Sequence, residues 1–177
     1  MIRVCSQLTF CSPQNILKRT VVEQDKNHII TGLFSLDGRA VESYQTLFFD
    51  GILSSGIVSV KKNLATEDTD NLVVDYQYID VSDISPSVKI IPNGKPLILD
   101  FGNLTSHEIN LGLASIAPAL QNFTVFELIA SCTFYPNVLM GIPAGIAINS
   151  PVDIILWEGM DLINKRITDH TSIRTFC

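Results

Sequence analysis

The sequence TVFELIASCTFYPNVLMGIPAGIAINSPVDIILWE, residues 124–158, contains the strongest structural signals in the chain. Thr124 opens a capping box with the glutamate three residues later, which predicts that a helix begins there. Because proline cannot continue a helix without losing a hydrogen bond, we expect this helix to stop before Pro136 and a short second helical turn to follow the break. A loop rich in Gly and Pro follows at 143–151, and the nearly continuous apolar run 152–157 predicts a strand buried on both faces.

Upstream of this stretch, the sequence predicts short strands first and a helix later. Alternating polarity, β-branched residues and intervening turn residues predict five strands, at 2–10, 16–23, 28–34, 45–49 and 52–60. Asp50-Gly51 is a turn signal between the last two of these strands. Apolar residues spaced three to four apart predict an amphipathic helix over 106–121, which Pro118 bends or shortens.

The remaining segments carry weaker signals. The acidic residues 65–71 predict an exposed loop, and residues 72–79 predict a strand. Asn93-Gly94 predicts the turn of a hairpin. The strands of that hairpin would be 88–91 and 96–100, and 163–176 predicts one or two more strands.

These elements together predict an α+β fold. The apolar strand 152–157 needs partners, and the N-terminal strands are the most plentiful supply. We therefore expect a small β-sandwich or sheet formed by N- and C-terminal strands around a short helical insert. In domain terms, residues 1–64 and 143–177 form a discontinuous strand domain, and residues 65–142 form an insert with two to three helices.

Composition excludes several function classes. The 177 residues carry a net charge of −6 with only 12 Lys and Arg, so there is no basic stripe for nucleic acid. No apolar run approaches the roughly 20 residues of a membrane helix, and the N-terminus lacks a signal-peptide pattern. Cys5 and Cys11 lie six apart, which is neither a zinc nor a redox spacing. We expect a reduced, cytoplasmic protein without metal or cofactor.

The motifs after residue 124 resemble the C-terminal segment of amidohydrolase-superfamily enzymes, dihydroorotases in particular. Those enzymes have a helix with a T-x-N-P-A signature, a G-L-P element, a G-x-I-x-x-G-x-P-A-D loop and an apolar strand. Thr133 and Pro136 match the signature, whereas Tyr135 and Asn137 replace its Asn and Ala. Gly141-Ile142-Pro143 matches the second element, and residues 144–153 follow the loop with one residue fewer.

The N-terminal part resembles the same family. Residues 50–60 are similar to the P-G-x-x-D-x-H-x-H segment through which those enzymes enter their catalytic barrel. Ser55 stands in place of the proline, and Lys61 and Asn63 stand in place of the metal-binding histidines. Residues 112–120 resemble the helix after the last barrel strand, so that the resemblance covers 1–64 and 97–160.

Three residues are candidates for chemistry, and all are weak. Asp100 lies where the resemblance would place the catalytic aspartate of the last barrel strand, and His107 lies beside Glu108 at a helix start. A carboxylate without a metal or a positioned water has no general-base role. We therefore expect turn hydrogen bonding from Asp100, capping of the helix by His107 and Glu108, and no catalytic residue.

The resemblance implies a dihydroorotase-like chain that lacks most of the metal-binding (β/α)8 barrel. A complete barrel takes about 250 residues, whereas residues 65–105 are all that lies between the two matching parts, and none of the three histidines forms a His-x-His pair. We expect a non-catalytic or degenerate homologue, linked by family to pyrimidine metabolism. It would act as a structural or interaction module that self-associates or docks to a protein partner.

Two alternatives stay open. One is a small amidohydrolase-related hydrolase of cyclic amides with a rebuilt site around Asp100, His107 and Glu108. The other is a ligand-binding β-sandwich, which would be favoured if the N- and C-terminal strands did not share a sheet.

Overall fold

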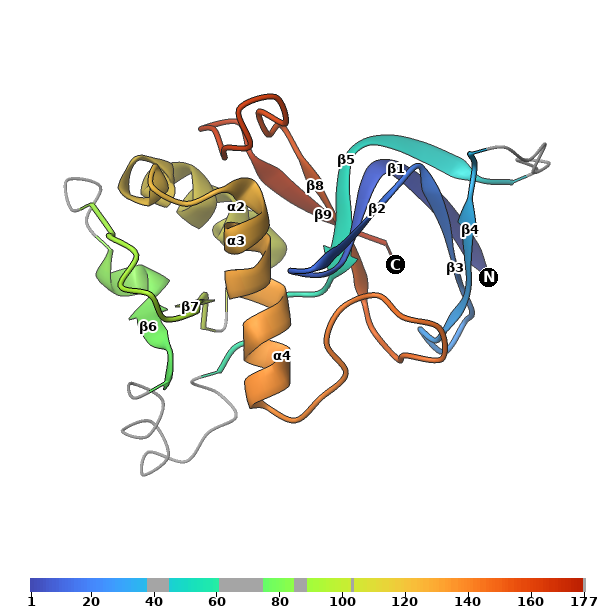
Figure 1. Ribbon diagram of the computed structural model, residues 1–177, viewed down its shortest axis with the longest axis horizontal. Coiled ribbons are helices and arrows are strands. Elements are labelled where there is room, and N and C mark those ends of the chain that lie inside the picture. The colour runs from blue at the N-terminus through green and yellow to red at the C-terminus, as the bar shows by residue number, and fades with distance from the viewer. Residues whose placement is uncertain (38–44, 61–74, 85–88, 103, 177) are drawn as a thin grey trace.

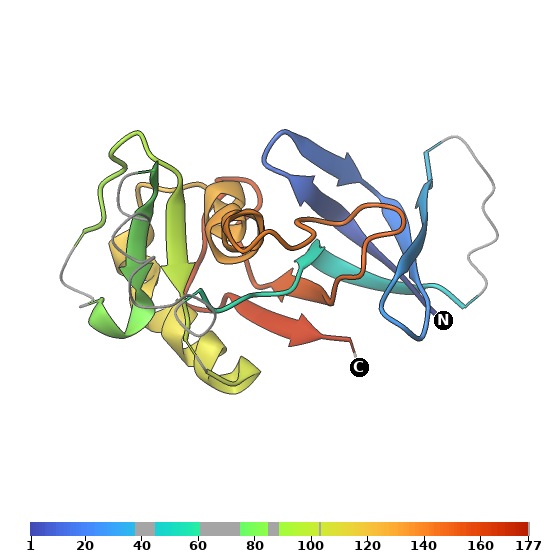
Figure 2. The same cartoon turned by 90° about the horizontal axis from the view of Figure 1, so that it is seen from below.

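The computed structural model describes residues 1–37, 45–60, 75–84, 89–102 and 104–176. The predicted loop at 65–71, positions Lys61 and Asn63, and Cys177 lie outside these residues. A large sheet formed by both ends of the chain lies to one side, and a small sheet lies to the other (Figure 1). The helical segment 125–139 lies between the two sheets in both views (Figure 2).

The large sheet confirms the predicted α+β class. Its strands run in the order β4-β3-β1-β5-β8-β9, and β2 pairs with β1. The bounds of these strands are β1 Ile2–Ser12, β2 Asn15–Lys18, β3 Thr20–Gln24, β4 Ile30–Ser35, β5 Leu47–Ser55, β8 Ile154–Glu158 and β9 Ser172–Thr175.

The N- and C-terminal segments share this sheet through one antiparallel pair. β5 pairs with β8 from Ile52↔Trp157 to Ser55↔Ile154. The residues 154–157 are all buried, as the run of apolar residues predicts. The alternative of a ligand-binding β-sandwich would be favoured if the N- and C-terminal strands did not share a sheet, and here they do share one.

The prediction of a turn at Asp50-Gly51 is wrong, because β5 runs straight through these residues. Gly51 adopts a φ of 136°, and a Cβ built there would lie 2.1 Å from the carbonyl oxygen of Trp157. The register with β1 shifts at this point, which is the signature of a β-bulge. A bulge and a turn both favour glycine, so the dipeptide alone does not distinguish them.

The predicted strand 16–23 is in fact two strands. Arg19 has a φ of 44° and separates β2 from β3. Both strands pair antiparallel with β1, β2 near its C-terminal end and β3 near its N-terminal end. The long strand β1 is therefore the shared partner of β2 and β3.

The small sheet contradicts the predicted hairpin at Asn93-Gly94. β7, Leu97–Asp100, pairs in parallel with β6, Gln77–Asp80, and not with the residues just before the turn. The short 3₁₀-helix η1, Val81–Asp83, follows β6. Parallel pairing joins segments about 20 residues apart in sequence and leaves no local signal of the kind that marks a hairpin.

The predicted helix at 106–121 is present in two parts. α2, Ser106–Ile116, is followed by the 3₁₀-helix η2, Ala117–Leu120, which contains Pro118. The shortening expected from the proline is confirmed, because proline removes an α-helical hydrogen bond.

The helix that begins at Thr124 does not stop before Pro136, contrary to the prediction. The predicted capping box is present, and α3, Val125–Ile129, passes through a π-helical turn, η3, Ala130–Phe134, into α4, Tyr135–Leu139. Within this turn the Tyr135 N–H donates to the carbonyl of Ala130, five residues earlier. The wider turn changes the hydrogen-bond register at the proline, so the chain stays helical.

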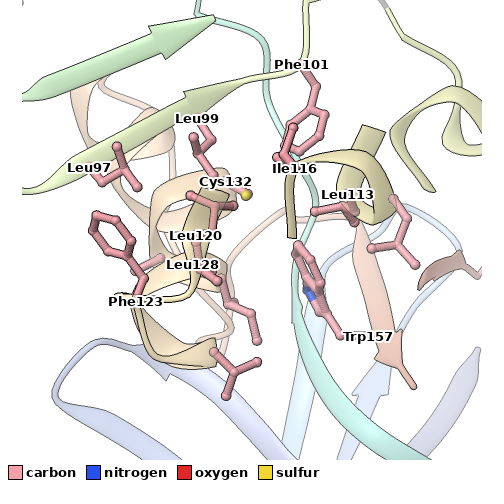
Figure 3. Packing of buried hydrophobic residues seen from close by; sticks show 14 of the residues in the cluster. Leu97, Leu99, Phe101, Leu113, Ile116, Leu120, Phe123, Leu128, Cys132 and Trp157 are labelled. Carbon is pink, nitrogen blue, oxygen red and sulfur yellow. The ribbon is translucent and has the colours of Figure 1, made fainter. Parts of the chain in front are cut away.

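The main core joins the helices to both sheets, because it includes Leu97 and Leu99 of β7 as well as Ile52 and Trp157 of the large sheet. Trp157 of β8 lies beside Leu113 of α2, and Ile116 and Leu128 belong to the same cluster (Figure 3). Apolar residues of α2 and of the segment 125–132 belong to this cluster. A second cluster is formed by Val4, Val22, Ile30, Leu53, Ile146, Val152, Ile154 and Leu156. Among the described residues no helix has the length and hydrophobicity to cross a membrane.

Candidate functional site

Asp100 is enclosed by the small sheet. Its side chain is fully buried at the end of β7. The Tyr78 hydroxyl donates to Oδ2 at 2.8 Å, and the Gly102 N–H donates to Oδ1 at 2.8 Å. Burial, followed by the hydrogen bond to Asp100, raises the pKa of Tyr78. The Gly102 contact is the turn hydrogen bonding expected from the sequence.

His107 and Glu108 lie in a different environment, exposed at the start of α2. The Glu108 carboxylate accepts hydrogen bonds from the Thr105 N–H at 2.7 Å and the Thr105 hydroxyl at 2.8 Å. The backbone hydrogen bond from Thr105 lowers the pKa of Glu108. Glu108 therefore completes a capping box, as its position at the helix start indicates.

The three sequence candidates do not combine into a metal centre. Across the described parts of the chain, no group of three or more His, Cys, Asp or Glu side chains is placed to hold a metal ion. Asp100 is buried in the small sheet, whereas the other two candidates are exposed.

A cavity of about 500 Å³ lies beside β5 and the residues after β8. It is lined by carboxylates, of which two are already engaged. Glu158 pairs with Arg174 at 3.0 Å, and Asp161 accepts hydrogen bonds from the N–H groups of Ile163 and Asn164. These contacts explain Glu158 and Asp161 as parts of the local fold, and Asp50 is the third carboxylate of the lining.

A smaller cavity of about 160 Å³ lies where the two ends of the chain meet the helices, and we name it the seam pocket. The end of β5, the helix α4 and the loop before β8 each contribute to its wall. Its apolar lining comes mainly from Ile57, Val58, Ile142, Pro143, Pro151 and Val152, and its polar side chains are Ser55, Asn137 and Asp153.

Two of these polar side chains are buried without a partner. Ser55 is 1% exposed and Asn137 is 3% exposed. Neither the hydroxyl oxygen of Ser55 nor Oδ1 of Asn137 has a hydrogen-bond partner among the described residues. A buried polar atom left unpaired costs about 1–3 kcal/mol, and native proteins leave few of them. Both residues line the seam pocket, and other described residues, among them Thr9, also carry a buried side-chain atom without a partner.

Local structure explains why Asn137 lies at this position. The helix ends in a Schellman motif, in which Ile142 N–H donates to the Asn137 carbonyl and Gly141 N–H to the Val138 carbonyl. Gly141 supplies the required positive φ of 66°. This turn brings Ile142 and Pro143 back beside Asn137, so that one short segment forms a corner of the pocket.

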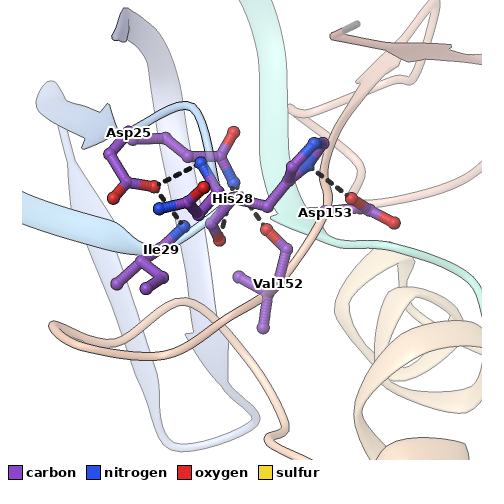
Figure 4. Close-up of polar contacts among 7 residues, drawn as sticks. Asp25, His28, Ile29, Val152 and Asp153 are labelled. Atoms are coloured by element: carbon purple, nitrogen blue, oxygen red, sulfur yellow. Dashed lines mark hydrogen bonds and ion pairs between the residues drawn. The ribbon is translucent and has the colours of Figure 1, made fainter.

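The third polar side chain, Asp153, is held at the exposed rim. Its Oδ1 lies 2.7 Å from Nδ1 of His28, and both side chains are more than half exposed (Figure 4). The Gly56 N–H donates to the Asp153 carbonyl at 2.8 Å, and the Val152 N–H donates to the His28 carbonyl at 3.0 Å. The Asp153 carboxylate is thus tied to the turn before β4, and its backbone carbonyl is tied to the end of β5.

Gln24 fastens that turn from inside. Its buried side-chain amide donates to the Val152 carbonyl at 2.6 Å and to the His28 carbonyl at 3.1 Å. On the other side of the turn, Asp25 Oδ1 accepts the N–H groups of Asn27 and Ile29 (Figure 4). The turn at the rim of the pocket is therefore held by several hydrogen bonds, whereas Ser55 and Asn137 each keep one side-chain atom without a partner.

The sequence itself contains one signal that singles out Ser55 and Asn137. Ser55 and Asn137 are both positions at which the chain departs from the motifs that it resembles, and in each case a polar residue replaces an apolar one. Asn137 also interrupts an apolar helix. Only the structure brings the two positions, 82 residues apart, into one pocket.

No family model, no curated protein and no solved structure matches this chain. The relationship to dihydroorotases therefore stays a prediction from the residues quoted above.

Proposed function

We propose that this chain is a non-catalytic, dihydroorotase-like protein that acts as a structural or interaction module. The observation that carries the proposal is the pairing of β5 with β8, which joins the two chain ends that resemble the family into one sheet. The same arrangement occurs in the small strand domain that the resemblance implies.

The surroundings of Asp100 support the absence of catalysis. A general base must reach the proton that it removes, and it needs a water or metal beside it. Both carboxylate oxygens of Asp100 instead accept hydrogen bonds from the fold, one from Tyr78 and one from Gly102.

Exposed aromatic side chains on the large sheet support an interaction role. The register runs Phe34↔Val21↔Cys5↔Phe48 across four strands, so these side chains share one face, on which Val21 and Cys5 are buried between the two phenylalanines. Phe34 is 40% exposed and Phe48 is 56% exposed. Exposed apolar patches often mark protein interfaces, and we propose that this face contacts a second copy of the chain or another protein.

Size-exclusion chromatography with light scattering tests the interaction role. We expect a dimer or higher oligomer, or a monomer that binds a protein partner through this face. Phe48→Ser should weaken the association, whereas Ile163→Ser, at a 92% exposed position on another segment, should not. A strict monomer that binds no partner, or equal behaviour of the two variants, would contradict the proposal.

Enzyme assays test the other half of the proposal. Purified protein should contain no stoichiometric zinc, and it should not hydrolyse dihydroorotate or hydantoin above the rate of an Asp100→Asn control. Turnover that the control variant loses would support the alternative of a small hydrolase with a rebuilt site.

We further propose a cytoplasmic location. Cys5, Cys11 and Cys132 are buried free thiols, which supports a reducing compartment. Fractionation of the native host cells should recover the protein with the cytoplasmic markers, and recovery from an oxidising compartment would contradict this proposal.

A further inference from the structure

We propose that Asn93 is a site of spontaneous deamidation, at which the backbone nitrogen of Gly94 attacks the asparagine side chain and leaves aspartate or isoaspartate. Strand pairing gives this dipeptide no role, because β7 pairs with β6 and not with the residues before the turn. This inference goes beyond the interaction role proposed above, because it concerns a chemical modification on a different segment of the chain.

The Asn93-Gly94 peptide lies on the surface. Every residue of the segment 91–96 is exposed and lies outside the helices and strands. A Cβ built on Gly94 would meet nothing within 4 Å, so the space around this residue is open. Water and hydroxide ions therefore reach this peptide without any opening of the fold.

The backbone N–H of Gly94 is available for reaction. Within the described part of the chain it donates no hydrogen bond. The nitrogen can attack only after it has given its proton to solvent, and a hydrogen bond from the N–H would hold that proton in place. Glycine also has no Cβ, so no side chain of its own obstructs the approach of its nitrogen. Gly94 therefore meets both requirements of the attacking residue.

The side chain of Asn93 is held in an Asx turn. Its Oδ1 accepts the backbone N–H of Lys95 at 3.1 Å. The ring that this hydrogen bond closes contains both Cγ of Asn93 and the nitrogen of Gly94, so the two reacting atoms belong to one short loop. The Lys95 N–H also stabilises the negative charge that develops on Oδ1 as Cγ becomes tetrahedral.

The reaction needs only water and a base from solvent. Solvent base removes the Gly94 proton, and the nitrogen forms a bond to Cγ of Asn93. The tetrahedral intermediate then expels the side-chain nitrogen as ammonia, which takes up a proton from water, and a cyclic succinimide remains. Water adds to one of the ring carbonyls and breaks its bond to nitrogen. The product is aspartate, or isoaspartate, in which the backbone runs through the side chain.

Three other exposed asparagines, Asn27, Asn122 and Asn149, lack an available nitrogen. In each case the N–H of the next residue donates to a backbone carbonyl: His28 to Asp25 at 3.2 Å, Phe123 to Leu120 at 3.0 Å and Ser150 to Ala147 at 3.0 Å. The next residue also carries a side chain that hinders the attack. The structure therefore distinguishes Asn93 by more than the glycine that follows it.

Incubation of the full chain at pH 8.5 and 37 °C, followed by peptide mass spectrometry, tests the proposal. Digestion with an acid protease avoids further reaction after the incubation. We expect Asn93 to convert to the acid at least about tenfold faster than Asn149, because the Gly94 nitrogen is free and unhindered. The rate should fall at pH 6, where less of the backbone nitrogen is deprotonated.

The product has two further signatures. A carboxylate replaces a neutral amide, so anion exchange should resolve a species with one more negative charge than the starting protein. An isoaspartyl methyltransferase should label the peptide that contains residue 93, because this enzyme methylates isoaspartate and not asparagine.

Two variants assign the reaction to this dipeptide. Gly94→Ala should slow it about tenfold or more, because the added Cβ hinders the attack. Asn93→Gln should abolish it, because the longer side chain disfavours ring closure. Asn149→Gln, at an exposed position whose next N–H is hydrogen-bonded, is the matched control and should leave the rate at Asn93 unchanged. In 8 M urea, where these hydrogen bonds are lost, the rate at Asn149 should rise relative to that at Asn93.

Three results would overturn the proposal. These are an Asn93 that stays intact in the folded protein, an Asn149 that reacts as fast as Asn93 in the folded protein, and a Gly94→Ala variant with an unchanged rate. If that variant failed to fold, the comparison of Asn93 with Asn149 in the unchanged protein would still decide. Light scattering of freshly purified protein tests the proposed interaction role separately, so either proposal can fail alone.

Discussion

The indole N–H of Trp157 on β8 donates a 2.8 Å hydrogen bond to the hydroxyl of Ser54 on β5. Both side chains are fully buried, and they join the two ends of the chain at the centre of the large sheet. The Ser54 hydroxyl donates onward to the Ser55 carbonyl at 2.9 Å. This contact therefore links the sheet to the first residue of the seam pocket.

Removing the acceptor of this bond should destabilise the protein. Ser54→Ala leaves the buried indole N–H unpaired, and we expect the free energy of unfolding to fall by about 1–3 kcal/mol. In a Trp157→Phe background the same change should cost less, because the donor is already gone. Urea unfolding followed by circular dichroism measures both. Tryptophan fluorescence cannot be used for this comparison, because Trp157 is the single tryptophan and one of the two backgrounds lacks it. Equal costs in the two backgrounds would show that the bond contributes nothing.

The bulge at Gly51 gives a second prediction. Gly51→Ala combines a positive φ with an overlap against the Trp157 carbonyl, and it should lower stability by more than about 3 kcal/mol. The matched control is Gly94→Ala, which has a φ of 82° but nothing within 4 Å of the added carbon. It should cost about 1 kcal/mol. Similar losses for the two variants in thermal unfolding would argue against the close approach of β5 and β8.

Buried thiols predict slow chemical modification. Burial raises the pKa of Cys132 to about 12 and that of Cys11 to about 11, and it also raises the pKa of Cys5. Since the thiolate is the reactive form, a Cys177→Ser variant should not react with a disulfide reagent at pH 8 while folded. All three remaining thiols should react in 8 M urea. Rapid reaction of a folded thiol would place that cysteine nearer the surface than the structure does.

The turn at Asp25 predicts a pH dependence. The backbone N–H of Ile29, and then that of Asn27, holds the pKa of the Asp25 carboxyl below its usual range. A carboxyl with a lowered pKa in the folded state stabilises the fold above its unfolded pKa of about 3.9, and this stabilisation is lost as pH falls through the folded pKa.

The comparison of Asp25→Asn with the unchanged protein measures this effect. We expect a lower urea midpoint for the variant at pH 7 and a shrinking difference between pH 4 and pH 2. Asp50→Asn, at an exposed carboxylate in β5, serves as the control. A difference for Asp25→Asn that does not change with pH would mean that its charge is not what stabilises the turn.

Signals that depend on a few neighbouring residues were sufficient to predict much of the fold. The capping box at Thr124 and the period of the helix that starts at Ser106 are present as predicted, and residues 154–157 of the apolar run form the buried strand β8. Each depends on hydrogen bonds within one turn or on which face of an element is apolar, and these are local properties. The pairing of the N- and C-terminal strands followed from the need to bury that apolar run.

The tertiary structure decided what the local signals leave open. Asp50-Gly51 becomes a bulge because the Trp157 carbonyl lies against it, and β7 packs on the helices while it pairs in parallel with β6. Pro136 stays inside a helix because a π-turn changes the hydrogen-bond register before it. The sequence by itself determined the elements and the class of fold. Only the tertiary structure left Ser55 and Asn137 unpartnered in one pocket, since a missing hydrogen bond depends on every neighbour in space.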